Sequence, residues 1–272
     1  MAPATITIDV DPTLDLGPLH LAWHGLTIAV GILVGTLVAA RFARRRGLDP
    51  ERVTGAALVM ALAGIAGARL LYLILNDAAA LGRPGDWFAT NGYALYGAVV
   101  LGPIAAALYL GRDRLLSSLD ALAFGFPFGL AVGRIGDVIN GEHHGPATTL
   151  PWGVRHPNPE ALVPSHTLAY HDGGLYELVL GVVLAVVVIA LRDRVRRPGM
   201  LLWTVLALYG AGRFAMFFYR GDTKPAALGL NQAQLISLVL VAAAVGLALL
   251  SRFGAWRRTA PGWLNRPSRR PV

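Results

Sequence analysis

The stretch Gly174-Leu-Tyr-Glu-Leu-Val-Leu-Gly-Val-Val-Leu-Ala-Val-Val-Val-Ile-Ala-Leu191 contains one charged side chain, Glu177, in 18 residues. As a helix it would be about 27 Å long, at about 1.5 Å per residue, and the hydrocarbon core of a bilayer is about 30 Å thick. Backbone polar groups inside a bilayer need partners within the chain, and a helix supplies them. The stretch therefore predicts a transmembrane helix and decides the fold class.

Six further apolar stretches are long enough to cross a bilayer, so the sequence predicts an all-α, polytopic membrane protein with seven transmembrane helices. The seven stretches run over Leu19–Ala40, Val53–Leu75, Tyr93–Leu110, Leu119–Ile139, Gly174–Leu191, Met200–Tyr219 and Ala233–Leu250. The composition agrees, because 55% of the 272 residues are hydrophobic and only 15% are charged. A soluble globular domain is excluded on this balance.

The arginines predict the orientation of the chain. Most of the 24 basic residues lie at residues 41–52, 112–114, 192–197 and 252–270, which follow the odd-numbered spans. Since positive charge accumulates on the cytoplasmic side, the N-terminus is expected outside and the C-terminus in the cytoplasm. We expect residues 1–251 to form a single seven-helix transmembrane domain with an external loop at residues 141–173. Residues 252–272 then form a basic cytoplasmic tail.

The net charge of +8 does not predict a nucleic-acid partner, because the basic residues lie in short loops instead of on one continuous soluble face. The chain has no cysteine, which excludes disulfides, a thiolate nucleophile and cysteine-ligated metal sites. His143 and His144 lie outside any recognisable metal-ligand spacing, so we interpret them as solvated loop residues. We expect no metal and no cofactor.

Three arginines fall inside apolar spans, and each lies near the outer end of its span: Arg69, Arg134 and Arg213. An intramembrane arginine is costly and marks a function by default. The nearby acids are Asp137, Glu142 and Glu177, of which Glu142 is expected in the loop, so a bound phosphate would balance the charge that the other two acids leave. The alternative is that the arginines snorkel to the interface or pair with these acids to hold the bundle together.

The stretch Gly133-Arg134-Ile135-Gly136-Asp137-Val138-Ile139-Asn140-Gly141-Glu142-His143-His144-Gly145 resembles the signature G-R-x-G-N-F-x-N-x-E-x-x-G of prolipoprotein diacylglyceryl transferases. The resemblance extends over nearly the whole chain and includes Trp23-His24-Gly25-Leu26, Tyr96-Gly97-Ala98 and Tyr209-Gly210-Ala211-Gly212-Arg213-Phe214. Enzymes of this family move the diacylglyceryl group of phosphatidylglycerol onto the lipobox cysteine of a prolipoprotein and release glycerol phosphate.

The resemblance implies a multi-pass protein of the bacterial cytoplasmic membrane whose partners are phosphatidylglycerol, prolipoprotein signal peptides with a lipobox cysteine, and membrane lipids. Arg134 and Arg213 would then clamp the phosphodiester and stabilise the departing phosphate. The remaining residues expected to bind phosphatidylglycerol are Asn140, Glu142 and Gly145, and the supporting residues are Arg69 and Glu177.

The chain departs from the family pattern at His24, Tyr96, Asp137 and Phe217, and the family's H-P-S/T-x-x-Y-E run is reduced to His171-Asp172-Gly173-Gly174-Leu175-Tyr176-Glu177. The group that removes the thiol proton is left open among His24, Tyr96, Asp137 and Glu142, of which His24 has an unperturbed pKa nearest neutrality. We place His24, Tyr96 and Asp137 with the two arginines as catalytic residues. The departures also allow a family member that binds or presents anionic phospholipid without transferring it. An anion transporter is a third reading, based only on the embedded arginines.

Overall fold

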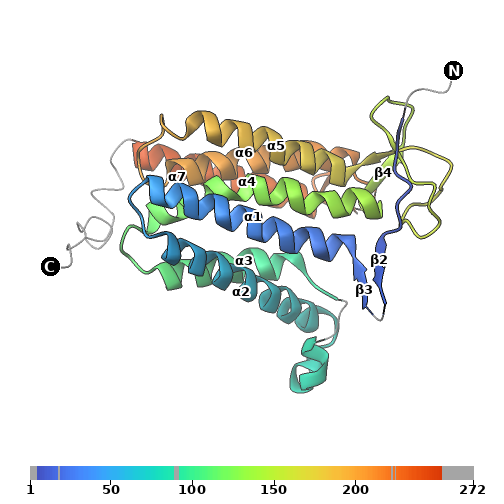
Figure 1. Cartoon of the computed structure of the whole chain (residues 1–272), viewed down its shortest axis with the longest axis horizontal. Helices are drawn as coiled ribbons and strands as arrows, with labels where there is room; N and C mark the ends of the chain where they lie inside the picture. Colours follow the sequence, from blue (N-terminus) through green and yellow to red (C-terminus); the bar gives the residue numbers. More distant parts are fainter. Residues whose placement is uncertain (1–4, 18, 89–91, 222, 224, 253–272) are drawn as a thin grey trace.

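Long helices make up most of the chain and run side by side along one axis in the computed structural model (Figure 1). The structure describes residues 5–17, 19–88, 92–221, 223 and 225–252. Within these ranges the helices are α1 (Trp23–Arg45), α2 (Pro50–Asn76), α3 (Leu95–Leu110), α4 (Leu115–Asn140), α5 (Gly173–Leu191), α6 (Met200–Met216) and α7 (Gln232–Arg252). Six are long and apolar enough to cross a membrane, and α3 is apolar but shorter. The chain is therefore a mostly helical, polytopic membrane protein.

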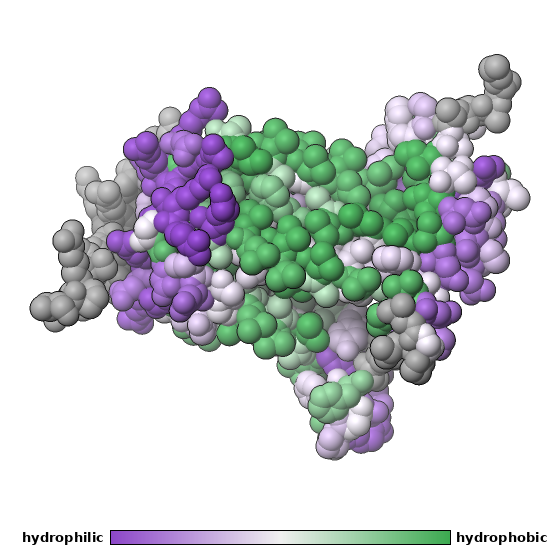
Figure 2. Space-filling view, viewed as in Figure 1, coloured by the Kyte–Doolittle hydropathy of each residue, from purple (hydrophilic) through white to green (hydrophobic). Residues whose placement is uncertain are grey.

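The surface of the bundle agrees with this class, since Figure 2 shows an apolar belt between two more polar ends. Large apolar side chains project from the belt, and Leu33, Leu37, Leu62 and Val186 are each more than half exposed. A soluble protein would not leave so continuous an apolar surface uncovered, whereas lipid chains cover it in a bilayer.

Short strands gather at one end of the bundle, which we call the strand end. A four-stranded sheet has the order β1-β5-β6-β4 and joins the N-terminal segment to the loop at residues 141–173. A hairpin of β2 and β3 precedes α1, and a small hairpin of β7 and β8 precedes α7. The strands are β1 (Ile6–Thr7), β2 (Thr13–Leu16), β3 (Leu19–Ala22), β4 (His144–Ala147), β5 (Val154–Arg155), β6 (Tyr170–Asp172), β7 (Pro225–Ala227) and β8 (Leu230–Asn231). Three short 3-10 helices also lie near this end: η1 (Ala78–Gly82), η2 (Pro84–Phe88) and η3 (Phe217–Tyr219).

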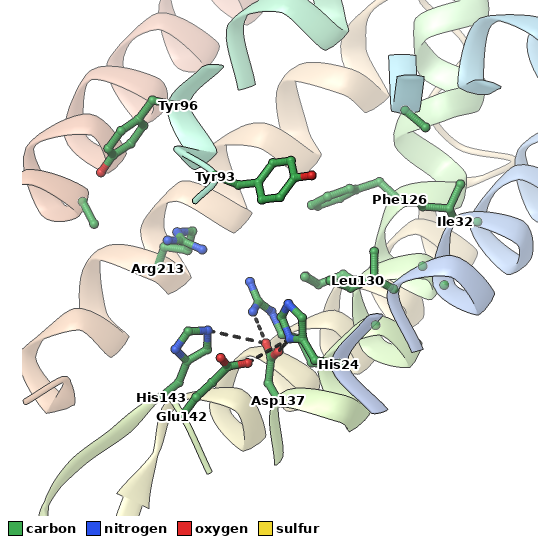
Figure 3. A pocket seen from close by; sticks show the side chains of 18 of the residues that line it. His24, Ile32, Tyr93, Tyr96, Phe126, Leu130, Asp137, Glu142, His143 and Arg213 are labelled. Carbon is green, nitrogen blue, oxygen red and sulfur yellow. Dashed lines mark hydrogen bonds and ion pairs between the residues drawn. The ribbon is translucent and has the colours of Figure 1, made fainter. Parts of the chain in front are cut away.

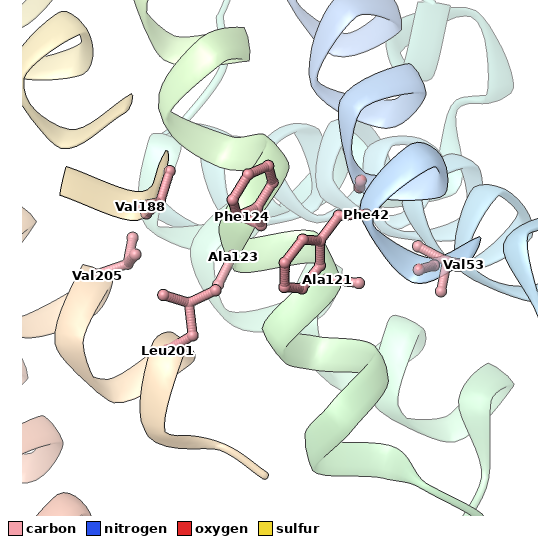
Figure 4. Close-up of a cluster of buried hydrophobic side chains, with 10 residues drawn as sticks. Phe42, Val53, Ala121, Ala123, Phe124, Val188, Leu201 and Val205 are labelled. Atoms are coloured by element: carbon pink, nitrogen blue, oxygen red, sulfur yellow. The ribbon is translucent and has the colours of Figure 1, made fainter. Parts of the chain in front are cut away.

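The opposite end, which we call the arginine end, carries the connections at residues 46–49, 111–114 and 192–199. Buried side chains close the bundle there, and the rings of Phe42 and Phe124 stack with their centroids 4.2 Å apart (Figure 4). The Asp120 carboxylate accepts hydrogen bonds from the amides of Gly199 and Leu202 and so caps the start of α6. Of the predicted basic tail, residues 253–272 lie outside the described residues.

Glycines bring α1 and α4 into backbone contact along a line that we call the glycine seam, formed by Gly31, Gly35, Gly125 and Gly129. A Cβ on Gly129 would lie 2.7 Å from the carbonyl oxygen of Gly31, and one on Gly35 would lie 3.2 Å from that of Gly125. Small residues permit such close approach of helices in membranes. The seam fixes α1 beside α4, the helix that carries Arg134 and Asp137.

Candidate active site

A cavity of about 1040 Å3 opens between α1, α2, α4, α6 and the segment that leads into α7. Its lining is polar toward the strand end, where His24, Asp137, Glu142, His143 and Arg213 lie, and apolar farther along the helices (Figure 3). The apolar lining includes Ile28, Ile32, Leu122, Phe126 and Leu130. The cavity therefore suits an amphiphile with a polar head and hydrocarbon chains.

An ion-pair network joins four helices at the polar part of the cavity. The Arg134 guanidinium on α4 binds Asp137 through Nη1 and Glu177 of α5 through Nη2. Glu177 also binds Arg213 of α6, and Asp137 also contacts His24 of α1. Asp137 and Glu177 are 1% and 2% exposed, so the carboxylates are buried, while the cationic side chains reach the cavity. The network holds two guanidinium groups beside the space a ligand would fill.

Glycines next to these residues explain how the helices approach closely enough. A Cβ on Gly136 would lie 2.6 Å from the Cα of His24, so a larger residue would push α1 away from Asp137. A Cβ on Gly181 would lie 2.8 Å from the amide nitrogen of Ala131, so α5 meets α4 at the level that brings Glu177 to Arg134. The small residues around the site thus set the geometry of the network.

The imidazole of His24 is held from one side. Its Nδ1 makes a hydrogen bond to Oδ1 of Asp137 and lies 2.9 Å from Oε1 of Glu142. One N–H cannot point at both oxygens, and among the described residues Oε1 of Glu142 has no hydrogen-bond partner. Nδ1 therefore carries a proton that it donates to Asp137, and Nε2 is the nitrogen left for exchange with a substrate.

His24, Asp137 and Glu142 each offer one atom to a cation, and these atoms all lie within 4.8 Å of one another. A divalent ion could use such a set. Asp137, however, already binds the Arg134 guanidinium, whose positive charge disfavours a second cation at the same carboxylate. The geometry fits an ion-pair network better than a metal centre.

Arg69 lies apart from this network, although it shares the sequence context of Arg134. It is 5% exposed, and its Nε and Nη1 donate hydrogen bonds to the carbonyl oxygens of Asp86 and Gly92, each at 2.8 Å. Its guanidinium also lies over the rings of Tyr72 and Tyr93. Arg69 thus holds the connection between α2 and α3, and it does not line the cavity.

The other residues predicted for the site also form two groups, those that line the cavity and those that do not. Tyr96 lines the cavity, as does Glu142. Asn140 is buried at the end of α4 and does not line the cavity, and its carbonyl oxygen accepts a hydrogen bond from the Leu162 amide. A Cβ on Gly145 would overlap the carbonyl oxygen of Tyr219, so this glycine permits contact between β4 and η3.

Two basic residues of the cavity lining, His143 and Arg220, were not predicted as site residues. The interpretation of His143 as a solvated loop residue is wrong, because its side chain is 25% exposed and lines the cavity. Burial, with a smaller contribution from the charge of Arg220, lowers the pKa of His143. No motif singled out Arg220, yet it lines the cavity as well. A signal existed for His143 alone, since it immediately follows Glu142 in the signature stretch.

Taken together, the fold and the cavity define a polytopic membrane protein with an arginine–carboxylate site at the head of an apolar cavity. The family model described as "Prolipoprotein diacylglyceryl transferase" matches residues 12–250. The chain therefore belongs to the prolipoprotein diacylglyceryl transferase family.

Relatives named phosphatidylglycerol–prolipoprotein diacylglyceryl transferase resemble the chain over most of its length. One from Thermosynechococcus vestitus is 34% identical over 242 residues, which is 85% of this chain and 88% of the relative. Another from Geobacter sulfurreducens is 34% identical over 256 residues, 89% of this chain and 95% of the relative. A third from Clostridioides difficile is 30% identical over 226 residues, 81% and 87% of the two chains.

Proposed function

We propose that the protein transfers the diacylglyceryl group of phosphatidylglycerol to the lipobox cysteine thiol of prolipoproteins and releases glycerol phosphate. The observation that carries this function is the pair Arg134 and Arg213, joined by Glu177 at the polar head of an otherwise apolar cavity. Guanidinium groups suit the bidentate binding of phosphate. The apolar lining provides for the acyl chains.

The protein then lies in the bacterial cytoplasmic membrane with seven crossings. The strand end faces outside, because the arginine end carries the excess of arginine in its short connections. This places the N-terminus and the loop at residues 141–173 outside, with residues 1–251 as one transmembrane domain and residues 252–272 as a basic cytoplasmic tail. The polar part of the cavity opens at the level of the outer leaflet.

In the reaction the cysteine sulfur attacks the glycerol carbon that bears the phosphate ester. A carbon–sulfur bond forms, the carbon–oxygen bond breaks, and both electrons of that bond leave with glycerol phosphate. Arg134 and Arg213 stabilise the charge that grows on the phosphate oxygens, and they are preorganised by Glu177 and Asp137. Holding both substrates in one cavity supplies a further part of the acceleration.

The thiol loses its proton as the sulfur attacks, and His24 is the group we assign to receive it at Nε2. Its Nδ1–H is bound by Asp137, and the carboxylates of Asp137 and Glu142 stabilise the imidazolium that forms. Tyr96 has no such carboxylate contact among the described residues and serves as a wall of the cavity. Glu142 contacts the bound lipid directly, while Asn140 and Gly145 act on it by shaping the turn that carries Glu142.

The test is transfer of a labelled diacylglyceryl group from phosphatidylglycerol to a lipobox peptide by the purified protein. We expect transfer by the parent chain and a loss of at least about a hundredfold in Arg134→Ala and Arg213→Ala. Arg194→Ala, at an exposed arginine of the arginine end, is the matched control and should stay at the parent rate. Lipid binding by the parent without any transfer would overturn the proposed reaction.

A further inference from the structure

A histidine–arginine pair lies at the polar mouth of the cavity, beyond the ends of the helices that carry Arg134 and Arg213. His143 follows α4 by three residues, and Arg220 directly follows η3. Both line the cavity, and Nη2 of Arg220 lies 3.1 Å from Nδ1 of His143. Neither residue has a role in the reaction described above.

The contact between them determines which nitrogen of His143 carries the proton. A guanidinium only donates hydrogen bonds, so Nδ1 of His143 accepts and has no hydrogen. The imidazole is neutral at neutral pH, since burial and the charge of Arg220 lower the pKa of His143. Its proton is therefore on Nε2, which lies 3.8 Å from Oδ2 of Asp137; this contact, a dashed line in Figure 3, is longer than a hydrogen bond.

The chain positions this pair from several sides. The Phe217 ring lies beneath two guanidinium groups, with the Arg213 Cζ 4.8 Å and the Arg220 Cζ 5.1 Å from its centroid. A Cβ on Gly173 would lie 2.8 Å from the Cδ of Arg220, so this glycine makes room for the arginine stem. The Gly173 amide donates a hydrogen bond to the carbonyl oxygen of His143 at 2.8 Å. These contacts fix the positions of the imidazole and the guanidinium at the cavity.

A lipid in the cavity would have its parts at different depths. Its acyl chains occupy the apolar lining, and its phosphate lies at Arg134, six residues before the end of α4. The headgroup beyond the phosphate then points toward the strand end, where His143 and Arg220 lie. A glycerol headgroup offers hydroxyl oxygens that accept a hydrogen bond from an N–H donor.

We propose that His143, oriented by Arg220, donates a hydrogen bond from Nε2 to the glycerol headgroup of bound phosphatidylglycerol. This assignment rests on the proposed function, because it takes the phosphodiester to lie at Arg134 and Arg213. It makes His143 a headgroup-binding residue and Arg220 a positioning residue that acts through the imidazole. A neutral hydrogen bond of this kind gives a several-fold preference for a hydroxylated headgroup.

The experiment compares two lipids that share the diacylglycerol and the phosphodiester. Phosphatidylglycerol has headgroup hydroxyls, and phosphatidylmethanol has none. Dissociation constants for both are measured on the purified full chain by displacement of a fluorescent phosphatidylglycerol, with the transfer assay run in parallel. Transfer by the parent tests the proposed reaction. The headgroup contact is tested by the ratio of the dissociation constant of phosphatidylmethanol to that of phosphatidylglycerol, so failure of one proposal is distinguishable from failure of the other.

His143→Ala should weaken phosphatidylglycerol about three- to tenfold and leave phosphatidylmethanol unchanged. His143→Gln should restore most of the affinity, because its amide nitrogen can stand near the place of Nε2, whereas His143→Asn should not. An equal loss for both lipids would overturn the headgroup assignment, as would no loss for either. The melting temperature of each variant identifies a general loss of structure. If His143→Ala loses structure, the affinities of His143→Gln decide the outcome.

The positioning role of Arg220 has its own readout. Arg220→Lys retains a donor for Nδ1 and should preserve the ratio of the two dissociation constants, whereas Arg220→Met should lower it toward that of His143→Ala. When His143→Gln is already present, Arg220→Met should leave the ratio unchanged, because glutamine has no tautomer to select. A further fall of the ratio in the double variant would overturn the role of Arg220.

Discussion

Arg69 on α2 and Arg134 on α4 follow similar small residues, Ala66-Gly67-Ala68 and Ala131-Val132-Gly133, and both lie in the half of their helix nearer the strand end. Their surroundings differ. Arg69 is held by backbone carbonyls of the connection between α2 and α3, whereas Arg134 is held by the carboxylates of Asp137 and Glu177. The first arginine is enclosed by its own chain segment, and the second faces a cavity.

The energetic cost of embedding an arginine in the membrane is therefore met in two ways, which have different consequences. Carbonyl partners satisfy the donors of Arg69 and leave no place for a ligand, so its role is structural. Carboxylate partners fix the direction of the Arg134 guanidinium while its side chain remains 20% exposed at the cavity. Four substitutions test whether the surroundings of each arginine decide its role.

The largest effect is expected at His24, which shares Asp137 with Arg134. His24→Asn retains an amide donor near the place of Nδ1 and removes the proton acceptor at Nε2. General-base catalysis contributes about 10²- to 10⁴-fold, so we expect a fall of kcat of at least about a hundredfold. Rates are measured with saturating lipid and peptide. Retention of more than about a tenth of the parent rate would assign the proton transfer to another group.

A somewhat smaller loss is expected from Glu177→Gln. The carboxylate joins the guanidinium groups of Arg134 and Arg213, and its removal leaves two partly buried cations with one fewer counter-charge. We expect transfer to fall about thirtyfold and the free energy of unfolding to fall by about 3 kcal/mol. Thermal unfolding in detergent and the transfer assay measure the two effects. An unchanged melting temperature would show that Glu177 contributes nothing to holding the arginines.

Arg69→Met should separate stability from transfer. The substitution removes the hydrogen bonds to the carbonyls of Asp86 and Gly92, and we expect the free energy of unfolding to fall by about 2–3 kcal/mol. Transfer per folded molecule should stay within about threefold of the parent, because Arg69 does not line the cavity. A loss as large as that of Arg134→Ala would erase the distinction between the two arginines.

The smallest effect on transfer is expected at Asp172, an acid that has a backbone partner. It caps α5 by accepting a hydrogen bond from the Leu175 amide, and burial raises its pKa from 3.8 to about 7. Because the folded-state value is the higher one, the stability contribution of Asp172 is present below about pH 4 and is lost as the pH rises toward 7. The negative charge of Asp137 adds to the shift and Arg220 opposes it.

Asp172→Asn keeps the capping oxygen and removes the titration. The parent should lose stability relative to this variant by about 1 kcal/mol for each pH unit between about pH 5 and 6.5. Melting temperatures of both proteins across this range measure the difference. Parallel curves would show that Asp172 does not titrate there.

The sequence predicted where the helices lie along the chain, but it did not predict which side chains of different helices contact one another. One physical reason explains both results. Hydropathy reports how deep a residue lies in a bilayer, so the predicted span Gly174–Leu191 differs by one residue from α5, and the three arginines lie within seven residues of the strand-end termini of their helices. Hydropathy does not report the position around the bundle. The separation of Arg69 from Arg134, and the place of Arg220 beside His143, depend on contacts between distant segments.

The strands of the loop at residues 141–173 were missed for a related reason. β4, β5 and β6 have two to four residues each, too few for an alternating pattern, and β5 pairs with a strand more than 140 residues away. The residues of the ion-pair network were named from the sequence, which left open whether they have a structural or a functional role. Its connectivity could come only from the packing of α1, α5 and α6 against α4.

The glycine seam has a consequence for the traffic of molecules through the membrane plane. Backbones that touch cannot slide apart to admit a lipid without losing their contacts, so α1 and α4 form a closed wall on one side of the cavity. The backbones of α2 and α3 also touch, at Gly67 and Gly97, so a bulky diacyl substrate and the still larger acylated product then have to pass between the pair α2 and α3 and the pair α6 and α7. Entry of the lipid and exit of the lipoprotein would then share one face of the bundle.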